Sequence, residues 1–179
     1  HTHEHMPERL AVPGFLRGSR WKALRGEPAY LVLYEVAHLD VLTSAPYLQR
    51  LNAPTPWTTR MMPAYRNMTR GLCRVRASHG HGLGGQALLI RLRLPGSETS
   101  DPDPLREFLG ALALRRGISS AHWLEGAVQA PMTREQSIRG ADRSVDSALL
   151  ITAYDEAALD ALEAGELAAV APAHGPDQA

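Results

Sequence analysis

The sequence has very little cysteine and no long apolar segment. Cys73 is the single cysteine among 179 residues, which excludes an intramolecular disulfide framework and indicates a reducing compartment. No apolar run is long enough to cross a bilayer as a helix, so we expect no membrane partner. Together these two observations predict a cytoplasmic protein. The chain begins at His1 without a visible signal peptide, and we expect a segment upstream of this residue.

The sequence also lacks an excess of charge of either sign. It has 19 Lys and Arg against 19 Asp and Glu, and this balance argues against a general electrostatic surface for nucleic acid. We therefore expect no nucleic-acid partner. Aromatic residues are few, at 6%, whereas 44% hydrophobic and 21% charged residues are typical of a globular protein. A chain of this length can bury one sizeable core or two smaller ones.

One stretch of the sequence occurs twice. Residues 31–42, LVLYEVAHLDVL, align with residues 151–162, ITAYDEAALDAL, at an offset of 120 positions. Tyr34 aligns with Tyr154, and both copies continue into Leu-Asp-x-Leu. In each copy an apolar strand pattern ends at an acidic residue and is followed by a helix pattern with leucines three residues apart. Similarity at a long offset indicates internal duplication.

The first copy is predicted to contain a β-hairpin followed by two short helices. Aromatic and branched residues favour the second hairpin strand, and hydroxyl side chains are good N-caps for the helices. Pro7 is expected to interrupt the first helix, because proline removes a hydrogen-bond donor. The predicted segments are a helix end at 1–10, strands at 15–24 and 29–36, helices capped by Ser44 and Thr55, and a strand at 72–77.

The second copy has the clearest helix pattern in the chain. Apolar residues follow Asp103 with helical spacing, and Gly117 is expected to end the helix. A long charged insertion at residues 128–146 has no counterpart of similar length in the first copy, and loops of this length are commonly functional. The predicted segments are strands at 86–94, 118–127 and 148–154, and helices starting at 103 and 156.

Each copy is therefore predicted to be a ferredoxin-like βαββαβ unit or a piece of one, the first copy lacking its opening strand. We expect an α+β protein with tandem ferredoxin-like repeats at residues 1–80 and 86–170 and a disordered tail at 171–179. Two helices would cover one face of each antiparallel sheet. The open faces would then cover each other as an α+β barrel, within the chain or in a homodimer.

Four short motifs resemble a known group of proteins. They are His5-x-Pro7-Glu8-Arg9-Leu10, Pro13-Gly14-Phe15, Tyr34-Glu35-Val36 and Pro54-Thr55-Pro56-Trp57-Thr58. The chain resembles the dimeric α+β barrel superfamily and, within it, the EthD-like proteins and their double-length relatives. That superfamily includes cofactor-free monooxygenases, muconolactone isomerases, polyketide cyclases, haem enzymes and non-catalytic proteins. The resemblance therefore implies the fold and leaves the reaction open.

The resemblance places His5, Glu8 and Arg9 near the barrel opening, and we expect them to be the catalytic residues. A neutral imidazole can take a proton from an acidic carbon or a phenol, and a guanidinium can stabilise the resulting oxyanion. In the alternative interpretation, Glu8 and Arg9 form a structural ion pair and His5 packs at the helix end.

Most of the large aromatic residues would line a pocket for a flat apolar ligand if they converge between the sheets. The alternative is that they pack in the core. A histidine among them is also what a haem protein would need, which is a third hypothesis. The predicted ligand-binding residues are Trp21, Tyr34, Trp57, Tyr65, His122 and Trp123.

Three other patterns in the sequence have simple interpretations beside the functional ones. Residues 1–5, HTHEH, fit a zinc pattern, but no third ligand lies at a matching helical position, so we expect no metal and no cofactor. Residues 80–85, GHGLGG, lack the Lys-Ser/Thr ending of a phosphate-binding loop. Alternating strand arginines either face solvent or would bind a carboxylate. These are Arg74, Arg76, Arg91 and Arg93.

The function expected from these features is that of a small cytoplasmic enzyme of aromatic or polyketide-like catabolism. It would act on a small apolar organic molecule between the sheets, either by proton transfer, as an isomerase or cyclase, or by cofactor-free oxygenation. The alternative is a non-catalytic protein of the same fold that binds a small molecule or serves in an assembly.

Overall fold

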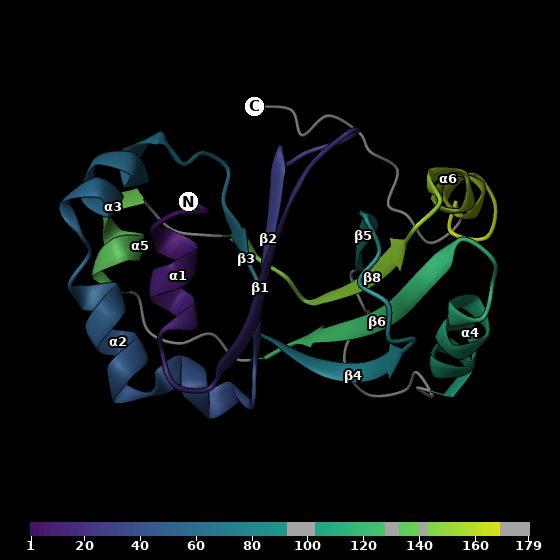
Figure 1. The fold of residues 1–179 in the computed structure, drawn as a ribbon, viewed down its shortest axis with the longest axis horizontal. Helices are drawn as coiled ribbons and strands as arrows, with labels where there is room; N and C mark the ends of the chain where they lie inside the picture. Colours follow the sequence, from purple (N-terminus) through teal and green to yellow (C-terminus); the bar gives the residue numbers. More distant parts are fainter. Residues whose placement is uncertain (93–102, 128–132, 140–142, 169–179) are drawn as a thin grey trace. The chain divides into compact units, whose positions relative to one another are not determined.

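The computed structural model describes residues 1–92, 103–127, 133–139 and 143–168. The chain divides into two compact units: unit 1 comprises residues 1–72 and 128–144, and unit 2 comprises residues 73–127 and 145–179. Each unit contains helices and strands (Figure 1), which confirms the predicted α+β class. The predicted disordered tail at 171–179 lies outside the described residues.

Unit 1 is built on an antiparallel β-hairpin. Strand β1 (Phe15–Lys22) pairs with β2 (Tyr30–Val36) along its whole length, which confirms the predicted hairpin. The β2 sequence, YLVLYEV, consists almost entirely of aromatic and branched residues that favour a pleated, half-buried strand. A second, very short sheet pairs β3 (Thr69–Arg70) in parallel with β7 (Arg143–Ser144).

Short helices lie beside the hairpin in unit 1 (Figure 1). Pro7 does not interrupt the first of them, because it lies in the first turn, where a backbone N–H has no partner within the helix. Thr55 caps its helix as predicted, accepting a hydrogen bond from the Thr58 amide at 3.0 Å. Ser44 occupies the N-cap position of α2 as predicted, but its side chain does not bond to the helix amides; its hydroxyl donates to the Val41 carbonyl at 2.7 Å. The helices are α1 (His5–Leu10), η1 (Leu39–Thr43), α2 (Ala45–Asn52), α3 (Pro56–Met61), η2 (Met62–Ala64) and α5 (Arg134–Arg139).

The core of unit 1 is small and partly aromatic. The Phe15 ring lies 5.8 Å from the Tyr34 ring in an edge-on arrangement and 5.2 Å from the Tyr47 ring. Such ring pairs add to the stabilisation from apolar burial alone. These ring contacts also fix where the hydroxyl groups of Tyr34 and Tyr47 lie. The buried members of the cluster are Val12, Phe15, Val41, Tyr47 and Leu51.

Unit 2 contains a four-stranded antiparallel sheet with the order β4-β6-β8-β5. Strands β5 and β6 are joined through α4 (Asp103–Ala113), and both run antiparallel to β8, which lies between them. The two strands on either side of β8 therefore run parallel to each other. A second helix, α6 (Glu156–Ala164), follows β8. The strands are β4 (Cys73–His79), β5 (Gln86–Leu92), β6 (Ile118–Gly126) and β8 (Ser147–Ala153).

Both helices of unit 2 pack on the same face of this sheet (Figure 1). Leu109 and Leu112 of α4 and Leu159 and Leu162 of α6 belong to one buried cluster with alternate residues of the strands. Because side chains alternate between the two faces of a strand, the residues between those core positions lie on the face opposite the helices. The strand residues in the cluster are Ala77, Ile90, Ile118, Ala121, Trp123, Leu149, Ile151 and Ala153.

Glycine is required where the chain enters β5. Gly84 has φ of +65°, and a Cβ added there would lie 2.7 Å from both the backbone nitrogen and the backbone oxygen of Ala153. A side chain at this position would strain the backbone and push β5 away from β8. The glycine-rich segment before β5 is therefore a close-packed turn at this residue.

The two units differ from each other more than a simple duplication predicts. None of the sheets formed by the described residues closes into a barrel. Strand β4, expected in the first repeat, pairs within the unit 2 sheet, and α5, expected in the second, lies in unit 1. The tandem ferredoxin-like arrangement stays a prediction, because it concerns shared ancestry of the two halves, whereas the units are defined by packing.

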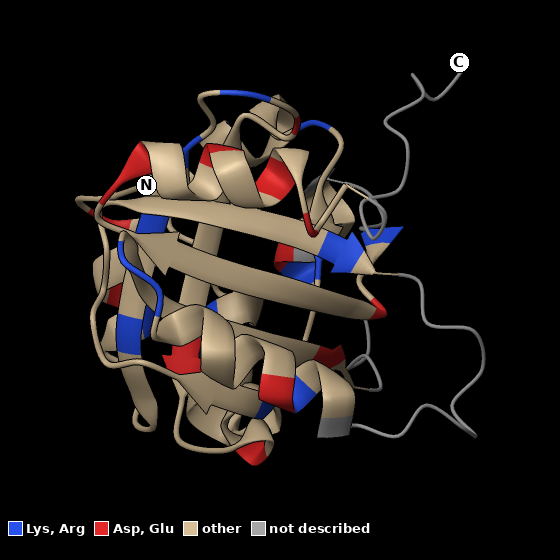
Figure 2. Cartoon of the chain, turned by 90° about the vertical axis from the view of Figure 1, so that its right-hand side faces the viewer, with Lys and Arg blue, Asp and Glu red and all other residues tan. Residues whose placement is uncertain are grey.

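Charged residues of both signs are interspersed over the elements (Figure 2). This distribution agrees with the equal numbers of basic and acidic residues in the sequence. Among the described helices, none combines the length and the apolar character that a membrane crossing requires.

Candidate functional site in unit 1

A buried ion pair lies at the centre of the polar residues of unit 1. Nη2 of Arg9, on α1, lies 2.5 Å from both carboxylate oxygens of Glu135, on α5, and both side chains are only 4% exposed. The Arg9 guanidinium also stacks over the Tyr47 ring, 5.9 Å from its centroid. Arg9, predicted as the oxyanion partner of a reaction, therefore already has a full negative charge beside it.

Tyr34 on β2 brings a second polar group into the same region. Its hydroxyl is buried and has no hydrogen-bond partner among the described residues. Desolvation raises the pKa of Tyr34 to about 12; Tyr47, Tyr65 and Glu135 act in the same direction, and Arg9 opposes them. The phenol is therefore protonated at any physiological pH and can donate one hydrogen bond. A buried, unpaired hydroxyl costs about 1–3 kcal/mol, so it requires an explanation.

The backbone next to Tyr34 is kept free of side chains by Gly18. A Cβ at Gly18 would lie 3.2 Å from Cγ of Met6 on α1 and 3.2 Å from Cε1 of Tyr34. The Met6 side chain and the Tyr34 ring thus meet over Gly18. Methionine is unbranched and adapts readily to a changed neighbour. The Met6 side chain can therefore adjust its contact with the Tyr34 ring.

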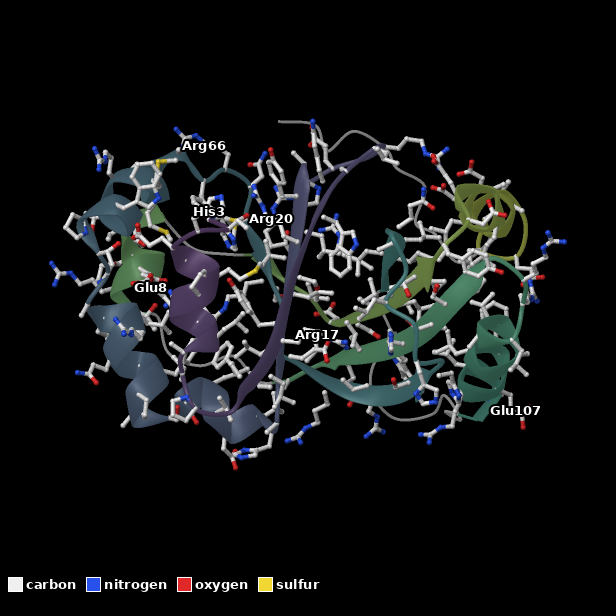
Figure 3. The ribbon with its side chains drawn as sticks, viewed as in Figure 1. His3, Glu8, Arg17, Arg20, Arg66 and Glu107 are labelled. Atoms are coloured by element: carbon white, nitrogen blue, oxygen red, sulfur yellow. The ribbon has the colours of Figure 1, made fainter. Side chains whose placement is uncertain are left out.

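The other two predicted catalytic residues lie on the same short helix as Arg9. His5 begins α1, and its ring centroid is 5.0 Å from that of His1. Glu8 lies one residue before Arg9 on α1 (Figure 3). The carboxylate that binds Arg9 comes from Glu135 and not from this neighbour. The structure thus places all three predicted residues in the first ten positions of the chain, with only Arg9 linked to Tyr34 through its charge.

The predicted aromatic residues do not form one pocket wall. Tyr34 and Tyr65 lie near enough to influence each other electrostatically. Trp57 is 44% exposed, with the Arg60 guanidinium 5.1 Å above its ring. Trp21 is half-buried on β1. Trp123 belongs to unit 2, where it is 6% exposed in the core and its Nε1 donates to the Ser147 hydroxyl at 2.9 Å.

His122 lies on the opposite side of β6 from Trp123, because consecutive strand residues point to opposite faces. Its Nδ1 is 2.9 Å from Oγ of Ser78, and its Nε2 is 2.9 Å from Oγ of Ser120. Both ring nitrogens are thus hydrogen-bonded within unit 2. Within the described part of the chain, no three His, Cys, Asp or Glu side chains are grouped to hold a metal ion.

A hollow of about 310 Å³ lies in unit 2. It lies beside the C-terminal ends of α4 and α6, where Arg115 and Glu166 form an ion pair at 2.8 Å. None of the predicted site residues lines it. Its apolar floor is made by Leu112, Ile118, Ala158, Ala161 and Leu162.

Glu135 is the site residue that the sequence did not reveal. It lies in the long charged insertion, 126 positions from its partner Arg9. No local pattern distinguishes it from the neighbouring charges, and the contact exists only because α5 packs against α2 and η2. Tyr47 was likewise missed, although its spacing with Leu51 on α2 indicates a buried helix face.

Comparison with known proteins identified no relative of this chain. No family model matches the chain, and no match was found among curated proteins or among solved structures. The functional conclusion therefore rests on the geometry of the two units and on the resemblance of the motifs.

Proposed function

We propose that unit 1 binds a small, largely apolar organic molecule that carries a hydrogen-bond acceptor, and that Tyr34 donates the hydrogen bond to it. The observation that carries this proposal is the buried Tyr34 hydroxyl without a partner among the described residues. Its high pKa keeps the proton in place. A carbonyl, enol or phenol oxygen would supply the missing partner and recover the cost of leaving the hydroxyl unpaired.

The reaction proposed for this site is proton transfer of the isomerase or cyclase type, or cofactor-free oxygenation, in aromatic or polyketide-like catabolism. His5 would act as the base, and Tyr34 would stabilise the oxyanion that forms. The supporting feature is that a buried, protonated phenol is an effective oxyanion donor. Arg9 would contribute through its charge while remaining bound to Glu135. No cofactor is required in this scheme.

The fold proposed for the chain is the EthD-like form of the dimeric α+β barrel, built from two ferredoxin-like repeats. Unit 2 supports it, because β5, α4 and β6 form a split β-α-β unit with β8 inserted antiparallel between the two strands. The proposal includes a homodimer in the cytoplasm. It includes neither a nucleic-acid partner nor a membrane partner.

A non-catalytic binding protein is the second candidate, favoured by one observation. Glu135 neutralises Arg9 at 2.5 Å in a buried environment, so the guanidinium is less able to stabilise a new negative charge. In this version Tyr34 would hold the ligand and no proton would be transferred.

Hydrogen–deuterium exchange of a bound ketone separates the two candidates. 1-Tetralone is a suitable probe because it is flat, has one carbonyl acceptor and has acidic hydrogens beside it. We expect the wild type in D₂O to accelerate exchange at that carbon, and His5→Ala to reduce the acceleration by about 10²-fold or more, as for loss of a general base. The readout is the NMR signal of the exchanging hydrogens.

The matched control is His3→Ala, which removes an exposed histidine of the same segment (Figure 3). Binding without accelerated exchange would support the non-catalytic candidate. Accelerated exchange that His5→Ala leaves unchanged would remove His5 from the mechanism.

A further inference from the structure

A line of four hydrogen-bonded side chains crosses the unit 2 sheet on the face opposite its helices. Ser78 on β4 pairs in register with His122 on β6, and Ser120 on β6 pairs with Thr152 on β8. Their strand neighbours Ala77, Ala121, Trp123 and Ile151 belong to the core on the other face. The four polar residues therefore lie together without contributing to the apolar core.

The hydrogen bonds within this line form one continuous chain, and the tautomer of His122 sets its direction. Ser78 Oγ is 2.9 Å from His122 Nδ1, His122 Nε2 is 2.9 Å from Ser120 Oγ, and Ser120 Oγ is 2.6 Å from Thr152 Oγ1. If Nε2 carries the proton, it donates to Ser120, and the Ser120 hydroxyl donates to Thr152. Nδ1 then accepts a hydrogen bond from the Ser78 hydroxyl.

The inner hydroxyls of the line are buried and the outer one is exposed, which is the arrangement that a reactive outer hydroxyl requires. Ser120 and Thr152 are 2% and 4% exposed, whereas Ser78 is exposed to solvent. The buried hydroxyls hold the imidazole in one orientation. The outer hydroxyl, on a strand at the edge of the sheet, is accessible to a molecule from solution.

Two of the three strands that carry the line, β4 and β6, are irregular next to it. The pairing of β4 with β6 shifts between Val75 and Ala77, and the pairing of β6 with β8 shifts between Ile118 and Ser120. Each shift inserts one extra residue close to a member of the line. Such β-bulges are over-represented at sheet edges and beside active sites, where they redirect a side chain. The bulges are an observation separate from the hydrogen bonds, and they lie at the same place in the sheet.

We propose that Ser78 and His122 form a nucleophile–base pair that cleaves small carboxylic esters. Ser78 Oγ would attack the ester carbonyl carbon while His122 Nδ1 takes the hydroxyl proton. As the bond from carbon to the leaving oxygen breaks, His122 returns that proton to the leaving alcohol, and Ser78 is acylated. Water then attacks the acyl group with His122 again as base, which releases the acid and regenerates Ser78.

Ser120 and Thr152 are positioning residues in this proposal. They orient the imidazole through their hydrogen bonds. We expect esters with good leaving groups, such as aryl esters, to be the substrate class, because a good leaving group needs the least help from the acid that protonates it. This activity belongs to unit 2 and does not depend on the proposed ligand site at Tyr34.

Covalent labelling with a fluorophosphonate probe tests the proposal, because the probe reacts with activated serines and not with ordinary ones. We expect intact-mass analysis of the full chain to show one adduct, located on Ser78 by peptide mapping. Ser78→Ala should remove the adduct, and His122→Gln should slow its formation by about 10²-fold. Ser119→Ala, a change of the neighbouring strand serine outside the line, should leave the rate unchanged.

Thermal melting followed by circular dichroism shows which variants are folded. If His122→Gln does not fold, Ser120→Ala decides instead, with slower labelling expected because the imidazole loses its orientation. A hydrogen-bond line with a purely structural role would give no adduct on the wild type. Absence of labelling, labelling elsewhere, or an unchanged rate in a folded His122→Gln variant would overturn the proposal.

Discussion

At the scale of single residues, the proposed ligand binding depends on the protonation of Tyr34. The folded-state pKa of about 12 lies above the ordinary tyrosine pKa of 10.0, so the folded protein retains the phenol proton at pH values where the unfolded chain has lost it. The contribution of this proton to the free energy of unfolding is fully present below pH 10 and is lost as the pH rises towards 12. The ionisation of Tyr34 thus penalises folding only in strongly alkaline solution.

We expect the wild type to lose stability between pH 10 and 12 more steeply than the Tyr34→Phe variant, because phenylalanine has no proton to lose. Denaturant unfolding at successive pH values measures this. Phenolate absorbance supplies a second readout: of the five tyrosines, Tyr34 should titrate late, and its step should vanish in Tyr34→Phe. Identical alkaline curves for both proteins would contradict the burial assigned to this hydroxyl.

The two tyrosines that align in the internal duplication have different surroundings. Tyr34 and Tyr154 align in the two copies, but Tyr154 is 67% exposed and its hydroxyl accepts a hydrogen bond from the Gly117 amide at 2.9 Å. The sequence predicted Tyr34 as a ligand-binding residue from its size and motif alone. Whether a phenol has a partner depends on tertiary contacts, which alignment of the copies does not supply.

At the scale of elements, the Arg9–Glu135 ion pair joins α1 to α5. Removing one partner leaves an uncompensated buried charge, so Arg9→Met or Glu135→Leu alone should lower the free energy of unfolding by about 3–5 kcal/mol. The double variant should recover most of that loss, because neither charge remains. A double-mutant cycle by denaturant unfolding measures the coupling.

The exposed pair Arg17–Glu35 on the hairpin is the matched control (Figure 3). Its N–O distance is 2.7 Å, but both side chains are 51% exposed. We expect the corresponding single variants to cost about 0–1 kcal/mol, because solvent screens the pair. Equal costs for the two pairs would show that the first one is not buried in solution.

The strands could be predicted well from the sequence, and the faces of the strands less well. Branched and aromatic runs predicted β1, β2, β5, β6 and β8 to within a few residues. His122 and Trp123 were both expected in one pocket, although strand alternation puts neighbours on opposite faces. That rule was available from the sequence. The 3-10 helix η1 was missed because the leucine spacing also fits an α-helix.

At the scale of the whole chain, packing between distant segments could not be predicted. The insertion before β8 gave no indication that α5 would join unit 1, since nothing local marks Glu135 as the partner of Arg9. For the same reason β4, expected with the first repeat, was not foreseen beside β6. Contacts at long sequence separation depend on complementary surfaces, and one sequence does not display them.

The most direct test of the central claim is a native mass spectrometric titration of the full chain with 1-tetralone. We predict a bound mass for the wild type and for Tyr30→Phe, whose ring is 50% exposed. Binding to Tyr34→Phe should be weaker by about tenfold, which corresponds to one lost hydrogen bond of about 1.4 kcal/mol. No bound mass for the wild type, or equal affinity for the wild type and Tyr34→Phe, would contradict the claim that the Tyr34 hydroxyl binds the ligand.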